Sequence, residues 1–185
     1  MKKEWVDRQL DISALLAKRS FFLLGPRQTG KTSLTHHSLP DTLFYDLLDS
    51  KNYLALSHNP GRLAEEIGSS VKSVVIDEIQ RIPSLLNEVQ RLIETRHVNF
   101  LLTGSSARKL RRGGINLLGG RARVKYLHPL TYRELGDKFD LHRAMQRGLL
   151  PSIYFSDDPR ADLESYAGLY LQQEIMAEGA TRNIP

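Results

Sequence analysis

A glycine-rich segment that directly follows a short apolar run constrains this chain more than any other feature of its 185 residues. Residues 25–32 read Gly-Pro-Arg-Gln-Thr-Gly-Lys-Thr and fit the pattern G-x-x-x-x-G-K-[ST] at every fixed position. The preceding run, residues 21–24, is Phe-Phe-Leu-Leu, and a helix-compatible segment follows as far as Pro40. Strand, turn and helix in this order are the context in which the pattern forms a phosphate-binding loop.

The residue types of this segment suit a nucleoside triphosphate. Glycines let consecutive N–H groups point into one concavity, and the following helix adds its positive N-terminal end. Lys31 can reach the β- and γ-phosphates, and Thr32 offers a hydroxyl to Mg²⁺. The absence of an N-K-x-D sequence favours ATP over GTP. We therefore predict that ATP and Mg²⁺ bind here, with the nucleotide held by Gly25, Pro26, Arg27, Gln28, Thr29, Gly30, Lys31, Thr32 and Ser33.

The rest of the chain alternates short apolar runs with longer segments of helical spacing, which is typical of an α/β fold with a parallel sheet. Apolar runs at residues 21–24, 43–45, 74–76 and 100–102 predict four strands, and the alternating apolar positions of residues 123–127 indicate a fifth, weaker one. The clearest helix begins after Ser84, because apolar residues within 85–93 recur on one helical face. The sequence thus predicts a three-layer architecture, with helices on both faces of a parallel sheet.

Two acidic residues close the third predicted strand. A buried parallel strand delivers its last residues to the sheet edge where ligands bind in α/β folds. Asp77 can therefore hold Mg²⁺ opposite Thr32, and Glu78 can orient or deprotonate a water that attacks the γ-phosphate. A carboxylate that activates water favours hydrolysis over transfer to a small molecule, so Lys31 and Glu78 are candidate catalytic residues.

The fourth predicted strand leads into hydroxyl side chains. Thr103 or Ser105 can touch the attacking water or the γ-phosphate if this strand lies beside the one that ends at Asp77. An ordinary exit from strand to loop explains these two residues equally well, so both remain candidates.

Positive charge is concentrated in one interval of the chain. The formal net charge is +5, yet no acidic residue and nine Lys and Arg residues lie between Glu94 and Glu134. The remainder of the chain is net negative, so an anionic partner should meet this interval. Arg121 can enter a neighbouring subunit's nucleotide site as an arginine finger. The stretch from Arg108 to Arg123 can also be an arginine-rich lid over the chain's own nucleotide, a contact for nucleic-acid phosphates, or a solvated loop.

Composition removes several other classes of function. The chain has no cysteine, which excludes disulfides, thiolate metal centres and cysteine nucleophiles. No apolar run near the amino end reaches the length of a signal peptide or a membrane span. We therefore expect a cytoplasmic protein with no membrane partner.

Three blocks together resemble a known family. GPRQTGKTSL, VVIDEIQRIPSLLNEVQRLIE and FLLTGSSARKLRRGGINLLGGRARVKYLHPLTYREL are similar to the prokaryotic AAA-type ATPases that are usually followed by a C-terminal domain of unknown function. The resemblance implies an AAA+ P-loop core that binds ATP and Mg²⁺. Carried over by position, it implies Walker A residues Lys31 and Thr32, Walker B residues Asp77 and Glu78, sensor positions Thr103 and Ser105, and an arginine finger at Arg121.

This resemblance sets the expected organisation and activity. We expect a P-loop ATPase core over residues 1–138 and, over residues 139–185, a helical extension that is the truncated start of a second domain. The apolar side chains of residues 141–180 should not all be buried by this extension alone. The expected function is Mg²⁺-dependent ATP hydrolysis of the AAA+ type, in a chain able to form a homo-oligomer. The alternatives are a P-loop kinase with an arginine-rich lid, or a non-hydrolysing nucleotide switch that binds DNA through residues 108–125.

Overall fold

The computed structural model describes residues 5–105 and 118–170. The chain divides into two compact units. One is Leu10–His128, and the other joins Met1–Gln9 to Pro129–Pro185. The predicted boundary after residue 138 lies inside the second of these units.

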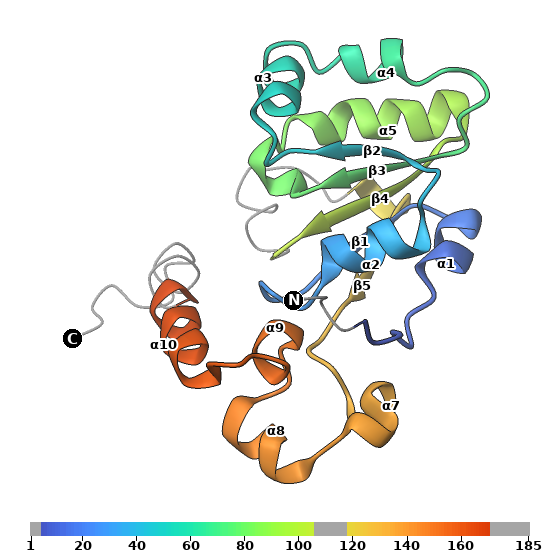
Figure 1. The fold of residues 1–185 in the computed structure, drawn as a ribbon. Coiled ribbons are helices and arrows are strands. Elements are labelled where there is room, and N and C mark those ends of the chain that lie inside the picture. Colours follow the sequence, from blue (N-terminus) through green and yellow to red (C-terminus); the bar gives the residue numbers. More distant parts are fainter. Residues whose placement is uncertain (1–4, 106–117, 171–185) are drawn as a thin grey trace. The chain divides into compact units, whose positions relative to one another are not determined.

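Five strands form one sheet in the Leu10–His128 unit, in the order β2-β3-β4-β1-β5 (Figure 1). Every neighbouring pair is parallel. The strands are β1 (Phe21–Leu24), β2 (Leu43–Asp46), β3 (Ser73–Asp77), β4 (Asn99–Gly104) and β5 (Arg123–Tyr126). Each overlaps a segment that the sequence predicts as a strand, so the predicted parallel α/β fold is confirmed.

Helices cover both faces of this sheet. Helices α3, α4 and α5 lie on one side, and α1 and α2 lie on the other (Figure 1). Their bounds are α1 (Ile12–Lys18), α2 (Lys31–Ser38), α3 (Ser50–His58), α4 (Arg62–Glu66) and α5 (Leu85–Arg96), with 3₁₀ turns η1 (Ile79–Arg81) and η2 (Leu118–Gly120). Helix α5 begins one residue after Ser84, as predicted, although the Ser84 side chain makes no capping hydrogen bond.

The core explains why the central strands are continuously apolar. In β1, Phe22 and Leu24 are buried in the cluster that includes the α5 side chains. Phe21 and Leu23 alternate with them along the strand, so they point to the opposite face, where they are equally buried. A strand covered on both faces needs apolar residues at every position.

The second unit is helical where the structure describes it. It contains α7 (Tyr132–Leu135), the 3₁₀ turn η3 (Gly136–Lys138), α8 (Leu141–Arg147), α9 (Pro151–Tyr154) and α10 (Pro159–Tyr170). Leu130, Leu135 and Tyr154 form its small core. On α8, Leu141 and Met145 are 65% and 80% exposed, in line with the expectation that this region leaves apolar side chains uncovered.

A buried ion pair joins the two chain segments of this second unit. Nε of Arg8 lies 3.0 Å from Oε1 of Glu134, and both side chains are only 6% exposed. Burial raises the pKa of Glu134, but hydrogen bonds from Arg8 and from the N–H groups of Gln9 and Thr131 outweigh it and lower the pKa. Among the described residues, no helix has the length and apolar character needed to cross a membrane.

Candidate functional site

The turn between β1 and α2 has the backbone that the glycine pattern predicts. At Gly25, a Cβ would stand 2.1 Å from the carbonyl oxygen of Leu127, so only glycine lets the end of β5 pass this closely. Gly30 has φ +89° and occupies the N-cap position of α2. Between them Gln28 also has a positive φ of 63°. The chain therefore turns sharply in front of the first helical N–H groups.

Lys31 is the first residue of α2, and its ammonium group is held inside this turn. Nζ donates to the carbonyl oxygens of Gly25 at 2.7 Å and Pro26 at 2.9 Å. The buried hydroxyl of Thr29 donates to the same Pro26 carbonyl at 2.9 Å. A positive charge thus lies at the N-terminal end of a helix, where the helix dipole also favours an anion.

The next residue links the turn to the third strand. Thr32 Oγ1 donates a 2.7 Å hydrogen bond to Oδ2 of Asp77, which ends β3 and is 1% exposed. The structure therefore brings the two predicted metal ligands together. No cluster of three or more His, Cys, Asp or Glu side chains suited to a metal occurs among the described residues.

The pair of Thr32 and Asp77 fits Mg²⁺ by its chemistry. Mg²⁺ prefers oxygen ligands, keeps several waters, and is usually bound through one or two carboxylates together with substrate phosphates. One carboxylate and one hydroxyl beside a phosphate-binding turn are a donor set of this kind.

Thr103 fixes both acids at the end of β3. Its hydroxyl donates to Oδ1 of Asp77 and accepts the backbone N–H of Glu78 at 3.1 Å. Thr103 is fully buried, so these two bonds occupy the hydroxyl away from solvent. Glu78 itself adopts a left-handed conformation, with φ 59° and ψ 44°, as the chain leaves the strand.

Ser105, the other predicted sensor residue, lies one residue beyond the end of β4. Its hydroxyl oxygen is buried and has no hydrogen-bond partner among the described residues. An unsatisfied buried hydroxyl is costly, and it leaves Ser105 with a donor that a ligand can use.

Sequence reasoning missed one residue at this site. Gln80, in η1, donates from Nε2 to Oε2 of Glu78. In the sequence, Gln80 stands two positions after Glu78, and no periodicity or motif rule assigns a role to an amide at that position.

Arg121 lies near the ends of the sheet where the strands begin, whereas the phosphate turn lies where β1 ends. It precedes β5, whose first residue Arg123 pairs with Phe21 at the start of β1, whereas the turn follows the end of β1. Arg121 forms an ion pair with Glu94 on α5, and both side chains are partly exposed. The structure does not bring Arg121 to the chain's own Lys31.

The remaining predicted residues fall into two groups. Arg27, Gln28 and Ser33 are exposed at the turn and the start of α2. Residues 106–117, which hold four of the nine basic residues between Glu94 and Glu134, lie outside the described residues.

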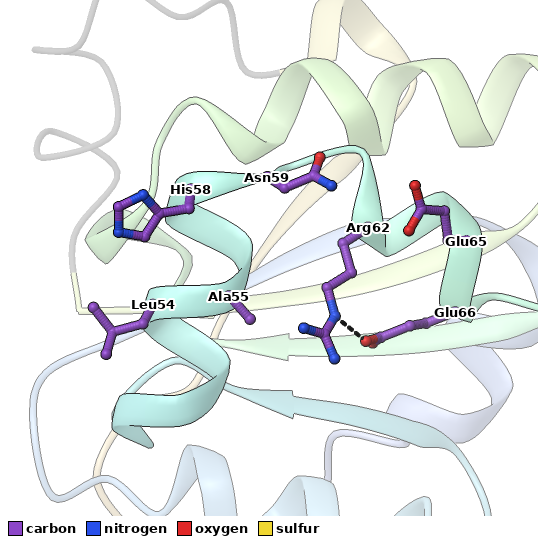
Figure 2. Close-up of a pocket in the computed structure, with 7 residues that line it drawn as sticks. All are labelled: Leu54, Ala55, His58, Asn59, Arg62, Glu65 and Glu66. Atoms are coloured by element: carbon purple, nitrogen blue, oxygen red, sulfur yellow. Dashed lines mark hydrogen bonds and ion pairs between the residues drawn. The ribbon is translucent and has the colours of Figure 1, made fainter.

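A separate pocket of about 730 Å³ lies at α3 and α4 (Figure 2). Its lining includes Leu54, His58 and Arg62, and none of the lining residues comes from the phosphate turn or from the ends of β3 and β4. Arg62 pairs with Glu66, which also accepts a 3.0 Å hydrogen bond from the Tyr45 hydroxyl. Burial and this contact with Glu66 raise the pKa of Tyr45. The pocket therefore shares no lining residue with the candidate site.

Comparisons with known proteins agree with this fold. The family model described as AAA domain matches residues 17–136. Two curated relatives, the uncharacterized proteins Mb2031c of Mycobacterium bovis and Rv2008c of Mycobacterium tuberculosis, are each 29% identical over 164 residues. That alignment covers 85% of this chain but only 36% of each relative, so the chain spans about a third of their length.

A solved structure is also similar. The Walker-type ATPase PABY2304 of Pyrococcus abyssi superposes with a TM-score of 0.60 at 16% sequence identity. The match covers 97% of this chain and 78% of that protein. At this identity the likeness establishes the fold alone.

Proposed function

Because the chain belongs to the AAA domain family, we propose that it binds ATP at residues 25–32 and hydrolyses it to ADP and phosphate with Mg²⁺. The observation that carries this proposal is the hydrogen-bond chain from Thr32 through Asp77 to Thr103. These bonds bring Thr32, which follows Lys31 of the phosphate turn, together with Asp77 at the end of β3.

In the proposed binding mode, the turn holds the triphosphate and Lys31 supplies the positive charge. Phosphate oxygens replace the carbonyl groups of Gly25 and Pro26 as partners of the Lys31 ammonium. Thr32 and Asp77 would hold Mg²⁺. When bound, the ion neutralises negative charge on the β- and γ-phosphate oxygens.

Glu78 orients the attacking water in this mechanism. The water oxygen bonds to the γ-phosphorus, the bond from that phosphorus to the ADP oxygen breaks, and the Glu78 carboxylate accepts the proton of the water. The bond from the Glu78 N–H to Thr103 supports this role, because it fixes the backbone from which the carboxylate projects.

Of the two sensor candidates, we assign the phosphate contact to Ser105. The Thr103 hydroxyl is already bonded to Asp77 and to the backbone of Glu78. The buried Ser105 hydroxyl lacks a partner among the described residues, so it can donate to the γ-phosphate or the attacking water.

We further propose that Arg121 acts on the nucleotide of a neighbouring copy, so that the working form is a homo-oligomer. Its place at the sheet edge opposite its own phosphate turn supports action in trans. The partly exposed ion pair with Glu94 is weak enough to exchange for a phosphate.

Phosphate release and ATP binding, measured on the wild-type chain, Glu78→Gln and Lys31→Ala, test the proposal. Glu78→Gln should bind ATP normally and hydrolyse it about 10²- to 10⁴-fold more slowly, the usual contribution of a positioned base. Lys31→Ala should lose ATP binding. Hydrolysis by Glu78→Gln at the wild-type rate would remove Glu78 from the mechanism. Formation of ADP only in the presence of an acceptor, without phosphate release, would instead favour the kinase alternative.

A further inference from the structure

We propose that Gln80 is a positioning residue that holds the carboxylate of Glu78 at the tip of β4, an inference that rests on the proposed ATP hydrolysis. The contact is direct, since the Gln80 side chain donates from Nε2 to Oε2 of Glu78. The two residues are separated only by Ile79, which is fully buried and anchors η1 in the core.

The orientation of the Gln80 amide is dictated by its surroundings. An ionised carboxylate only accepts hydrogen bonds, so the NH₂ group must face Glu78 and the carbonyl oxygen Oε1 must face away. Oε1 then packs against Gly104 at the end of β4. A Cβ on Gly104 would stand 2.6 Å from Oε1, so the absence of a side chain there makes room for the amide.

This arrangement does not serve stability. Oε1 of Gln80 is buried without a hydrogen-bond partner among the described residues, which costs free energy of folding. Glu78 adds a left-handed backbone, which is unfavourable for a residue with a side chain. Such local costs concentrate at functional sites, where the surrounding fold maintains them.

The strand order shows on which side of Glu78 its contact with Gln80 lies. Strand β4 lies between β3, which carries the acids, and β1, which leads into the phosphate turn. Gly104 pairs in register with Leu24, the residue just before the turn. Gln80 therefore draws the Glu78 carboxylate along the sheet edge toward the triphosphate side.

The test replaces Gln80 with methionine, which has a similar length and no amide. Gln80→Met should lower kcat by about 10- to 100-fold, the range expected when a catalytic group is displaced by about an ångström. The KM for ATP should not rise, and the ATP affinity and the Tm should not fall, because the lost amide leaves no unsatisfied carbonyl. In a Glu78→Gln background, Gln80→Met should have no further effect on hydrolysis, since the carboxylate that it positions is gone.

Gln90→Met is the matched control. Gln90 on α5 makes the same kind of contact, from Nε2 to Oε1 of Glu94 at 3.2 Å, on the helix surface. Its loss should leave kcat unchanged. Gly104→Ala provides an independent route, because the added methyl group displaces the flexible end of Gln80, and it should lower kcat in the same way.

The outcomes separate the inference from the function on which it rests. Normal kcat in Gln80→Met, alongside a slow Glu78→Gln, would overturn the role of Gln80 and leave the ATPase proposal standing. A parallel fall in kcat, ATP affinity and Tm would show a structural residue and would also overturn it. A wild-type chain without hydrolysis, or Glu78→Gln at the wild-type rate, would overturn both proposals together.

Discussion

The hydroxyl of Thr32 lies 2.7 Å from Oδ2 of Asp77, although the two residues are 45 positions apart in the chain. Thr32 belongs to the helix that follows the phosphate turn, and Asp77 is the last residue of β3. One hydrogen bond therefore joins the two halves of the proposed site. Thr32 and Asp77 are also the residues that would hold a divalent cation.

Replacing Asp77 with asparagine should remove the response to Mg²⁺. An amide carries no charge, and only one of its two polar atoms can accept the hydrogen bonds that Asp77 now receives from Thr32 and Thr103. Calorimetric titration with ATP should then give the same affinity in Mg²⁺ and in EDTA. Hydrolysis should fall at least about 100-fold, more than the loss of a group that supports a metal ligand usually costs.

The control for this substitution is Asp46→Asn. Asp46 ends β2 and pairs in register with Asp77, but its Oδ1 accepts the N–H of Leu48, a bond that asparagine can keep. Its response to Mg²⁺ should match the wild type. If Asp77→Asn also keeps the full response, Asp77 is not a metal ligand.

Thr103→Val and Ser105→Ala should separate structural support from phosphate contact. Valine removes both hydrogen bonds of the buried Thr103 hydroxyl and leaves an oxygen of Asp77 without its donor. We expect a loss of about 1–3 kcal/mol in the free energy of unfolding, together with slower hydrolysis. Thr103→Ser keeps the hydroxyl and should restore most of both.

Ser105→Ala deletes a buried hydroxyl that has no partner among the described residues. Urea unfolding should therefore show no loss of stability, whereas phosphate release should slow. A stable Ser105→Ala variant with normal turnover would contradict the assigned contact with the γ-phosphate.

Apolar runs predict the central strands β1, β3 and β4, because residues 21–24, 74–76 and 100–102 are buried on both faces of the sheet. The largely exposed edge strand β5 has no such run, and only its alternating apolar positions indicated it. The meeting of Thr32 with Asp77 was also predictable, since parallel strands bring their carboxyl ends to one sheet edge. The residue spacing alone specified no strand order. It therefore could not show that β4 lies between the strand that ends at Asp77 and the strand that leads into the phosphate turn.

The finer contacts of the site depend on interatomic distances that no sequence pattern encodes. Thr103, inside β4, bonds to Asp77, whereas Ser105 lies one residue beyond the end of that strand. The role of Gln80 depends on the left-handed turn at Glu78 and on the room left by Gly104. Both arise from tertiary packing, which decides side-chain partners after local preferences have set the strands.

The ion pair of Arg8 and Glu134 should make the second unit sensitive to acid. The folded state lowers the pKa of Glu134 below its ordinary value of 4.5. The ionised group therefore contributes stability above that value, and this contribution is lost as the pH falls through the lowered pKa. Near neutral pH, Glu134→Gln should cost about 3 kcal/mol, because it leaves the buried Arg8 without its counter-charge.

Fluorescence can report this unit selectively, since the only tryptophan of the chain is Trp5. In urea unfolding between about pH 7 and about pH 3.5, the difference between wild type and Glu134→Gln should shrink as carboxylates protonate. Glu164→Gln is the control, because Glu164 pairs with Arg160 on the surface, where both side chains are largely exposed. A difference that stays constant with pH would mean that the charge of Glu134 is not what stabilises the unit.

Mixing two inactive variants tests whether Arg121 acts in trans. Arg121→Ala should lower hydrolysis by about 10³-fold or more, as loss of an arginine finger does. Its Tm should stay near that of the wild type, because its ion pair with Glu94 is partly exposed and contributes little. Arg123→Ala, two residues further on and also exposed, should remain active.

Lys31→Ala cannot bind ATP but keeps its arginine, whereas Arg121→Ala binds ATP but lacks the finger. In a mixed oligomer, the intact arginine of one copy should complete the intact nucleotide site of the other. Phosphate release should therefore reappear in the mixture, with an optimum at intermediate ratios of the two variants. If Arg121 acted on its own nucleotide, no copy in the mixture would hold both parts and hydrolysis would stay absent.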